Sequence, residues 1–304
     1  MMAPDMLVIG RRGQLAGALA RTAPGAGLSV TCLGRPVIDL AAPETIAEAL
    51  DRTAPGVVVN AAAYTAVDRA EMEPERARAV NAWAPGIVAM WCRECGVPLI
   101  HVSTDYVFDG IGRVPYREDD PTGPLGVYGE TKLAGEIVVR DGVERHVILR
   151  TAWLHSADGA NFVTTMLRLA RERRVLRVVD DQHGAPTYVD DLAVAIVRLA
   201  GMILDGGPGW SSSREGLWGT YHLTNRGSAS RYEFARAIFD IASRSGAARP
   251  TVVPIASAEH GPSARRPAWS VLDTGLAERR LGLVLPHWRD GLERCLDRVA
   301  AEAA

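Results

Sequence analysis

Residues 8–16 read Val8-Ile9-Gly10-Arg11-Arg12-Gly13-Gln14-Leu15-Ala16, directly after the first β-branched stretch of the chain. Two glycines three residues apart, between a strand and a helix, let the backbone approach a phosphate group at the helix N-terminus. Ala16 stands where a third glycine is common and still permits close helix–strand packing. The segment therefore predicts a dinucleotide-binding turn. The cofactor contacts expected from it are Gly10, Arg11, Arg12 and Gly13.

Short apolar strands and amphipathic helices alternate outward from this turn. We expect strands at 7–9, 28–32, 57–60, 99–102 and 146–149, and helices at 14–21, 45–51, 77–95 and 128–140. Strands that are apolar on both faces and separated by helices indicate a parallel sheet covered on both sides. The sequence thus predicts an α/β protein with a Rossmann-like, doubly wound parallel sheet.

The second half of the chain is less regular. We expect helices at 162–173, 190–202, 232–243 and 288–301, and strands at 175–179 and 221–223. The stretch 205–219, rich in Gly and Ser, is predicted to be a loop at a domain seam. We predict a dinucleotide-binding domain of residues 1–153 plus roughly 174–200. A smaller C-terminal α/β substrate-binding lobe would comprise roughly 154–173 and 201–304.

The composition limits the possible partners and location. The chain has 304 residues and a formal net charge of −2, and of its 34 basic residues only Lys132 is a lysine. Scattered arginines and near-neutral charge predict no nucleic-acid or membrane partner. The apolar runs are far shorter than the ~20 residues of a membrane span. Met1–Asp5 carries no secretory pattern, and four cysteines form no disulfide framework, so we expect a cytoplasmic protein.

The end of the second predicted strand bears on the choice of cofactor. An Asp or Glu there usually binds the ribose 2′-hydroxyl of NAD. Here Cys32-Leu33-Gly34-Arg35 contains no acid, and the first acid is Asp39. Arg11, Arg12 and Arg35 together favour the 2′-phosphate of NADPH, while solvated surface arginines and the use of NADH remain alternatives.

Tyr128-Gly129-Glu130-Thr131-Lys132 carries the strongest chemical signal. A spacing of four on a helix places the Tyr128 phenol and the Lys132 ammonium on one face. A free tyrosine titrates near pH ~10, so a nearby cation is needed for acid–base work at neutral pH. Thr104 follows the strand predicted at 99–102, at the edge where such sheets bind ligands, and Ser103 is the alternative hydroxyl. These residues predict a general-acid site.

The chain resembles the extended short-chain dehydrogenase/reductase superfamily, and within it the dTDP-4-dehydrorhamnose reductase family. The matching segments occur in family order and include Gly10-x-x-Gly13-Gln14-Leu15, residues 60–68, residues 103–110, Tyr128–Lys132, residues 150–153, residues 181–187 and residues 264–267. The run Ser103-Thr104-Asp105-Tyr106-Val107-Phe108-Asp109-Gly110 is specific to this family. Tyr-x-x-x-Lys identifies only the superfamily.

The resemblance implies Tyr128 as proton donor, Lys132 as its partner and Thr104 as a residue that tunes the site. It implies substrate contacts at Thr104, Asp105 and Trp153. The cofactor contacts that it adds are Gln14, Leu15, Asp39, Leu40, Ala61, Ala62, Ala63, Tyr64, Thr65, Val102, Tyr128 and Lys132. The implied reaction is reduction of the C4 ketone of dTDP-4-dehydro-β-L-rhamnose to dTDP-β-L-rhamnose by hydride transfer from NAD(P)H. This is the last step of dTDP-L-rhamnose biosynthesis.

Three departures and two alternatives accompany this resemblance. Tyr64 stands where the family often has His, and Trp269 replaces a smaller polar residue. Members with a magnesium-bridged dimer carry a glutamate where this chain reads Ala16-Gly17-Ala18-Leu19, so no metal site is predicted and the Mg²⁺ requirement and the choice between monomer and homodimer stay open. The alternatives are another nucleotide-sugar 4-ketoreductase and a non-catalytic NADP-binding regulatory subunit. Asp105-Tyr106 after Thr104 disfavours a dehydratase, which needs Asp-Glu there.

Overall fold

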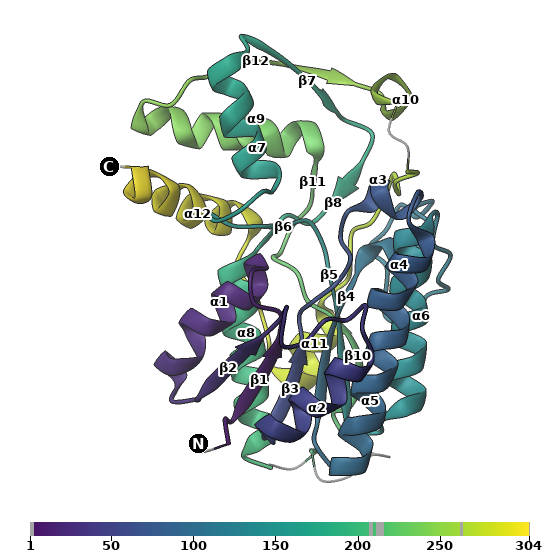
Figure 1. Cartoon of the computed structure of the whole chain (residues 1–304). Helices are drawn as coiled ribbons and strands as arrows, with labels where there is room; N and C mark the ends of the chain where they lie inside the picture. Colours follow the sequence, from purple (N-terminus) through teal and green to yellow (C-terminus); the bar gives the residue numbers. More distant parts are fainter. Residues whose placement is uncertain (1–2, 207–208, 211–215, 262–263, 304) are drawn as a thin grey trace.

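The computed structural model describes residues 3–206, 209–210, 216–261 and 264–303, which form two lobes (Figure 1). One lobe is built on a six-stranded sheet in the order β10-β5-β4-β3-β1-β2, in which every neighbouring pair is parallel. Its strands are β1 (Met6–Ile9), β2 (Val30–Leu33), β3 (Val57–Asn60), β4 (Leu99–Thr104), β5 (His146–Thr151) and β10 (Gly219–His222). The predicted doubly wound parallel sheet is confirmed.

Helices cover both faces of this sheet. One layer contains α1 (Gln14–Thr22), α8 (Val189–Leu204) and α11 (Gly275–Leu281), and the other contains α2 (Glu44–Thr53), α5 (Ala84–Cys95) and α6 (Val127–Gly142). Alternate residues of β1 face the two layers: Met6 and Val8 pack with the first, Leu7 and Ile9 with the second. This alternation explains why the strand is apolar throughout.

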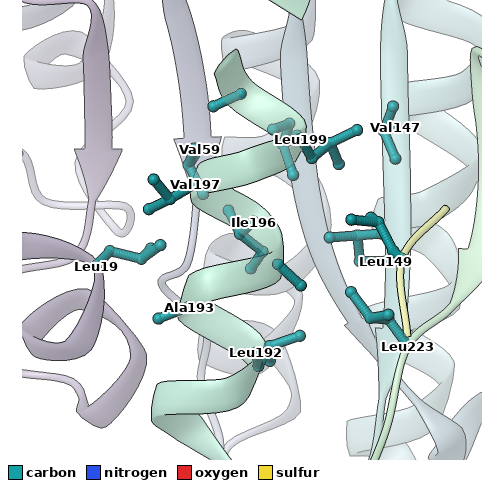
Figure 2. Close-up of a cluster of buried hydrophobic side chains, with 14 of the residues drawn as sticks. Leu19, Val59, Val147, Leu149, Leu192, Ala193, Ile196, Val197, Leu199 and Leu223 are labelled. Carbon is teal, nitrogen blue, oxygen red and sulfur yellow. The ribbon is translucent and has the colours of Figure 1, made fainter. Parts of the chain in front are cut away.

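The apolar side chains of α8 that face the sheet recur at helical spacing. Leu192, Ile196 and Leu199 are all fully buried, and Figure 2 shows them beside Val147 and Leu149 of β5. Positions four and three apart lie on one side of a helix, so these side chains form a continuous apolar ridge. Truncation of such a buried leucine to alanine costs about 2–5 kcal/mol.

The helix predicted at 77–95 is interrupted by a wider turn. It consists of α4 (Pro74–Arg78), a π-helical turn (Ala79–Trp83) and α5. Pro85 has no N–H to donate to the Asn81 carbonyl, which favours the wider turn. A Cβ atom added at Gly135 of α6 would lie 2.1 Å from the Asn81 carbonyl oxygen. Glycine at 135 therefore lets α6 approach this turn closely.

The second lobe packs three helices around a small core. These are α7 (Phe162–Glu172), α9 (Arg231–Ala242) and α12 (Trp288–Ala303). Three short strand pairs accompany them: β7 (Val175–Val179) with β12 (Thr251–Ile255), β8 (His183–Gly184) with β11 (Ala229–Ser230), and β6 (Leu154–His155) with β9 (Thr187–Tyr188). The remaining short helices are α3 (Val67–Ala70) and α10 (Ser257–His260).

Two strands, β7 and β10, each pair with a strand of the lobe other than the one predicted. β7, predicted within the dinucleotide-binding domain at roughly 174–200, pairs with β12 of the smaller lobe. β10, predicted within the lobe at 201–304, pairs with β5 at the edge of the main sheet, and α11 packs beside it. The pattern of a short apolar strand does not reveal its partner, so these two pairings did not follow from the sequence. Of the predicted loop 205–219, residues 207–208 and 211–215 lie outside the described residues.

In the described part of the chain, every helix is too short or too polar to span a bilayer.

Candidate active site

The turn between β1 and α1 is tight and carries no side-chain cap. Gly10 has φ +135°, and a Cβ atom added there would lie 3.2 Å from the Ala16 Cβ atom. Gly13 caps α1 without a side-chain hydrogen bond, and the first turn holds no acid. The backbone N–H groups at this helix start therefore lack a side-chain partner, which fits an anionic dinucleotide.

The three predicted arginines are exposed around this turn. A Cβ atom added at Gly34 would lie 3.0 Å from the Arg11 Cβ atom, so the loops that follow β1 and β2 are in contact. This contact places Arg35 next to Arg11, while Arg12 is exposed in the same loop. Three exposed arginines around one turn are consistent with the predicted 2′-phosphate site at this edge of the sheet.

Other predicted cofactor residues have partners within the protein. Gln14 Oε1 accepts a hydrogen bond from Ser156 Oγ at 2.8 Å. Asp39 Oδ1 accepts from the Ala41 N–H at 3.0 Å. Leu15 and Leu40 are 5% and 7% exposed and pack in the two hydrophobic cores. Their side chains therefore shape the turns, and a cofactor would meet mainly the backbone there.

The predicted cofactor segment 61–65 follows β3, and its Tyr64 backbone is held by a residue that sequence reasoning missed. The segment reads Ala61, Ala62, Ala63, Tyr64 and Thr65. Asn81 Oδ1 accepts from the Tyr64 N–H at 2.8 Å, and its Nδ2 donates to the Tyr64 carbonyl at 3.2 Å and to Thr131 Oγ1 at 3.1 Å. The Tyr64 hydroxyl donates to Glu73 Oε2 at 3.0 Å. Pro85, four residues after Asn81, was the available signal for a special turn.

Thr104, Asp105 and Tyr128 come together at the carboxyl end of β4. Thr104 Oγ1 donates to Asp105 Oδ1 at 3.0 Å and accepts from the Tyr106 N–H at 3.2 Å. Asp105 is 2% exposed, and burial raises its pKa to about 6. Its Oδ2 atom has no hydrogen-bond partner, although the nearby Ser270 hydroxyl lowers the pKa of the carboxyl group. The site thus contains an unpartnered acceptor.

The structure differs from the predicted pairing of Tyr128 with Lys132. Burial, with smaller effects from Asp105 and Tyr106, raises the pKa of Tyr128 above its usual value, against the opposing effect of a hydrogen bond with Thr104. Lys132 Nζ instead donates to the Val102 carbonyl at 2.7 Å. Burial lowers the pKa of Lys132 to about 8. Tyr128 is therefore a protonated phenol here.

Trp153 is covered by groups that the sequence did not indicate. It has a left-handed backbone, φ +47°, and the guanidinium carbon of Arg231 lies 3.4 Å from its ring centroid. A Cβ atom added at Gly184 would lie 2.5 Å from its indole nitrogen. The glycine in the segment 181–187 is thus needed for the indole to fit between the lobes.

Two arginines converge on Tyr106, whose ring meets that of Tyr128 edge-on at 5.6 Å. Arg231 and Arg266 both lower the pKa of Tyr106 against the effect of burial. Arg266 is paired with Asp68 at 2.7 Å. Arg231 is stabilised by Tyr106 and Asp105, and within the described ranges no carboxylate forms an ion pair with it. This half-buried cation suits an oxygen-rich or anionic ligand.

A hollow beside Tyr128 is lined by Tyr106, Gly126, Arg265 and Pro267, among others. A second hollow lies among α7, α9 and α12 and contains none of the predicted site residues. Among the residues that the structure describes, no three His, Cys, Asp or Glu side chains are placed to hold a metal ion.

Comparison with known proteins agrees with this geometry. Residues 4–301 match the family model described as the RmlD substrate binding domain. The chain is 44% identical over 290 residues to a dTDP-4-dehydrorhamnose reductase from Sinorhizobium fredii, covering 95% of each chain. It is 38% identical over 297 residues to the enzyme of that name from Salmonella typhimurium, covering 96% of this chain and 97% of the other.

Solved structures give the same result. A crystal structure of dTDP-4-dehydrorhamnose reductase from Bacillus anthracis in complex with NADP aligns with a TM-score of 0.88 and 34% identity, covering 98% of this chain and 100% of the other. The resemblance in the sequence motifs is therefore confirmed over nearly the whole chain. The chain belongs to the RmlD family of dTDP-4-dehydrorhamnose reductases.

Proposed function

We propose that this protein reduces the C4 ketone of dTDP-4-dehydro-β-L-rhamnose to dTDP-β-L-rhamnose, with NADPH as the hydride donor. One observation carries the proposal: Tyr128, at the start of α6, and Thr104, at the end of β4, lie at the carboxyl edge of the sheet, which also bears the glycine turn between β1 and α1. Open α/β sheets bind their ligands at this edge. The family and the named relatives supply the identity of the sugar nucleotide.

Tyr128 is suited to act as general acid. Its pKa is held above the ordinary value by burial, so the phenol keeps its proton until an alkoxide develops on the substrate. The Thr104 hydroxyl, oriented by Asp105 at 3.0 Å, lies against the same phenol and orients the sugar oxygen beside it. Lys132, one helical turn after Tyr128, stabilises the tyrosinate that is left and contacts the cofactor ribose.

NADPH would bind along the carboxyl edge of the main sheet. The start of α1 would face its pyrophosphate, and the exposed Arg11, Arg12 and Arg35 would bind its 2′-phosphate. Residues 61–65, of which Tyr64 is held by Asn81, and the Val102 backbone would line the nicotinamide side. The bound cofactor supplies the hydride. NADH remains possible as a weaker donor.

The substrate would bind between the lobes, near Asp105 and Arg231. Asp105 is buried beside this site and accepts from the Thr104 hydroxyl at 3.0 Å, so it would act on the sugar nucleotide mainly by orienting Thr104. Arg231, held flat by Trp153, presents N–H groups to the sugar nucleotide, whose diphosphate carries complementary charge. We propose that Thr104, Asp105 and Trp153 bind the substrate, with Arg231 as an addition to the set predicted from sequence.

We propose a cytoplasmic enzyme with a small-molecule substrate, without a nucleic-acid or membrane partner, acting as a monomer or homodimer. The main sheet with α8 and α11 would bind the dinucleotide, and the lobe of α7, α9 and α12 would bind the sugar nucleotide. Reduction of a different 4-keto sugar, or cofactor binding without turnover in a regulatory subunit, are the competing functions.

One assay separates these functions. The protein is mixed with dTDP-4-dehydro-L-rhamnose and NADPH, nicotinamide oxidation is followed by absorbance, and the product is identified by NMR. We expect stoichiometric oxidation and the L-rhamno product. Cofactor binding without oxidation would favour the regulatory subunit, and a product of different stereochemistry would indicate another ketoreductase.

A further inference from the structure

Three buried polar side chains link β3, β4 and α6. Asn60 and His101 are direct neighbours in the parallel register of β3 and β4, and Lys132 faces them from α6. Their exposed fractions are 1%, 0% and 2%. Asn60 Nδ2 lies 3.2 Å from His101 Nδ1, and Lys132 Nζ lies 3.4 Å from His101 Nε2. The imidazole thus connects the asparagine to the lysine.

The hydrogen-bonding capacities of these groups restrict where protons can be. Asn60 Oδ1 accepts from the Ala62 N–H at 3.3 Å, which turns Nδ2, a donor, towards His101. Burial, with smaller effects from Lys132 and His146, lowers the pKa of His101 well below its usual value, so the ring is neutral. A neutral imidazole has one N–H and one lone pair. If Nδ1 accepts from Asn60, the proton is on Nε2 and points at Lys132 Nζ.

This arrangement fits a neutral amine better than an ammonium at Lys132. An amine has a lone pair that accepts the Nε2–H, whereas an ammonium has none. For the ammonium to donate to Nε2, the Asn60 amide must reverse and give up its bond with the Ala62 N–H. While Lys132 is charged, the Val102 carbonyl at 2.7 Å is its well-placed acceptor.

We propose that His101, fixed by Asn60, is a positioning residue that holds Lys132 and makes its ammonium release a proton more readily. Its value to catalysis rests on the proposed function, in which Lys132 resupplies the proton that Tyr128 gives to the substrate. Among the described residues Lys132 Nζ is hydrogen-bonded to Val102 and His101, so this proton would have to pass through a bridging hydroxyl of a bound molecule. The ammonium loses one proton, the tyrosinate gains it, and the resulting amine accepts the Nε2–H bond. The contacts themselves do not depend on any substrate.

Other charged groups around Lys132 also affect its pKa. Glu136, one turn further along α6, raises the pKa of Lys132. That carboxylate is itself held by Arg150 of β5 at 2.8 Å and by Ser103 of β4 at 2.5 Å. Tyr128, on the other side along the helix, is an uncharged phenol. Among the described residues, His101 is the titratable side chain that Nζ contacts directly.

Lys132 is the only lysine of the chain, which makes the proposal directly measurable. Protein labelled with ¹³Cε-lysine gives one lysine signal, and its chemical shift against pH reports the protonation of Lys132 alone. We expect a wild-type midpoint near 8, in line with the burial of this group. In His101→Gln the amide oxygen accepts from the ammonium, and the midpoint rises by about one pH unit.

Asn60→Asp supplies an independent variant. Its carboxylate accepts from Nδ1–H, leaves the Nε2 lone pair facing Nζ and adds a negative charge, so the midpoint again rises by about one unit or more. His155→Gln is the matched control, because His155 is also 0% exposed but is not among the contacts of Lys132. Its lysine midpoint should equal that of the wild type.

The alkaline limb of the kcat–pH profile should move with the lysine signal in each variant. A merely structural role would lower kcat at every pH and leave the midpoint in place. Unchanged or lowered midpoints in folded His101→Gln and Asn60→Asp, as judged by circular dichroism, would overturn the proposal. If His101→Gln does not fold, Asn60→Asp decides alone. An inactive wild type would instead refute the proposed function, and the titration would still test the role of His101.

Discussion

The guanidinium carbon of Arg231 lies 3.4 Å from the indole centroid of Trp153. Trp153 follows β5 of the main sheet, and Arg231 is the first residue of α9 in the smaller lobe. The stack therefore joins the two lobes directly beside Asp105 and Tyr106. Arg231 also covers one face of the Trp153 indole, which the family resemblance had implied as a contact of the sugar. The substrate must meet the edge of the guanidinium, and this gives Arg231 a testable role.

Arg231→Gln should weaken substrate binding selectively. Loss of a hydrogen bond to a charged group is worth about 1.5–3 kcal/mol, which corresponds to a roughly 10- to 100-fold rise in KM for the sugar nucleotide. KM for NADPH should stay unchanged, because the predicted cofactor contacts are on the main sheet. Arg236→Gln, on the exposed side of the same helix, is the control and should resemble the wild type. Equal KM values in both variants would contradict this role.

Tyr128→Phe should remove the proton donor while preserving the fold. General acid catalysis contributes about 10²–10⁴-fold, so kcat should fall at least about 100-fold. NADPH binding, measured by fluorescence titration, should change little. Tyr106→Phe is a useful comparison, since it removes a neighbouring hydroxyl near the two arginines while leaving the Tyr128 hydroxyl in place. Near-normal turnover in Tyr128→Phe would exclude this residue as the acid.

Sequence reasoning succeeded where a residue's role depends on its own strand or helix. The alternation of strands and helices, the β1–α1 turn and the position of Tyr128 after β4 all followed from local patterns. It failed where partners come from distant segments. The sequence of β7 contains nothing that selects β12, and Arg231 is 78 positions from Trp153 along the chain. The predicted effect of Lys132 on Tyr128 also depended on burial, which spacing alone does not reveal.

The rate should depend on pH through Lys132. Burial lowers the pKa of Lys132 to about 8, and the ammonium is the form that stabilises the tyrosinate. Full activity is therefore expected below this pH, and kcat should fall as pH rises through about 8. Lys132→Arg should abolish this limb because arginine stays protonated. Its turnover should also be low, since a guanidinium does not fit the buried contact between Nζ and the Val102 carbonyl. Wild-type turnover in this variant would contradict the assignment.

Arg35→Asp should shift cofactor preference towards NADH. The substitution removes a cation proposed to face the 2′-phosphate and places an acceptor for a ribose 2′-hydroxyl. We expect the ratio of kcat/KM for NADPH to that for NADH to fall at least about tenfold, consistent with the loss of one charged hydrogen bond. Arg93→Asp, exposed at the end of α5, controls for the change in net charge. An unchanged ratio would mean that Arg35 is a surface residue without a role in cofactor selection.

The ion pair between Glu136 and Arg150 should be essential to stability. Its side chains are 0% and 3% exposed, and Arg150 donates three hydrogen bonds to the two carboxylate oxygens. Glu136→Gln leaves a buried guanidinium without its counter-charge, which should lower the free energy of unfolding by about 3–5 kcal/mol in urea denaturation.

The double variant Glu136→Gln/Arg150→Met tests this reason, because it also removes the charge that would be left unpaired and should regain much of the lost stability. Glu136 also raises the pKa of Lys132. The lysine NMR midpoint should therefore fall in Glu136→Gln, opposite to the rise expected in His101→Gln. Equal stability of Glu136→Gln and wild type would show that this pair does not hold the sheet to α6. A midpoint that failed to fall would show that Glu136 does not sustain the charge of Lys132.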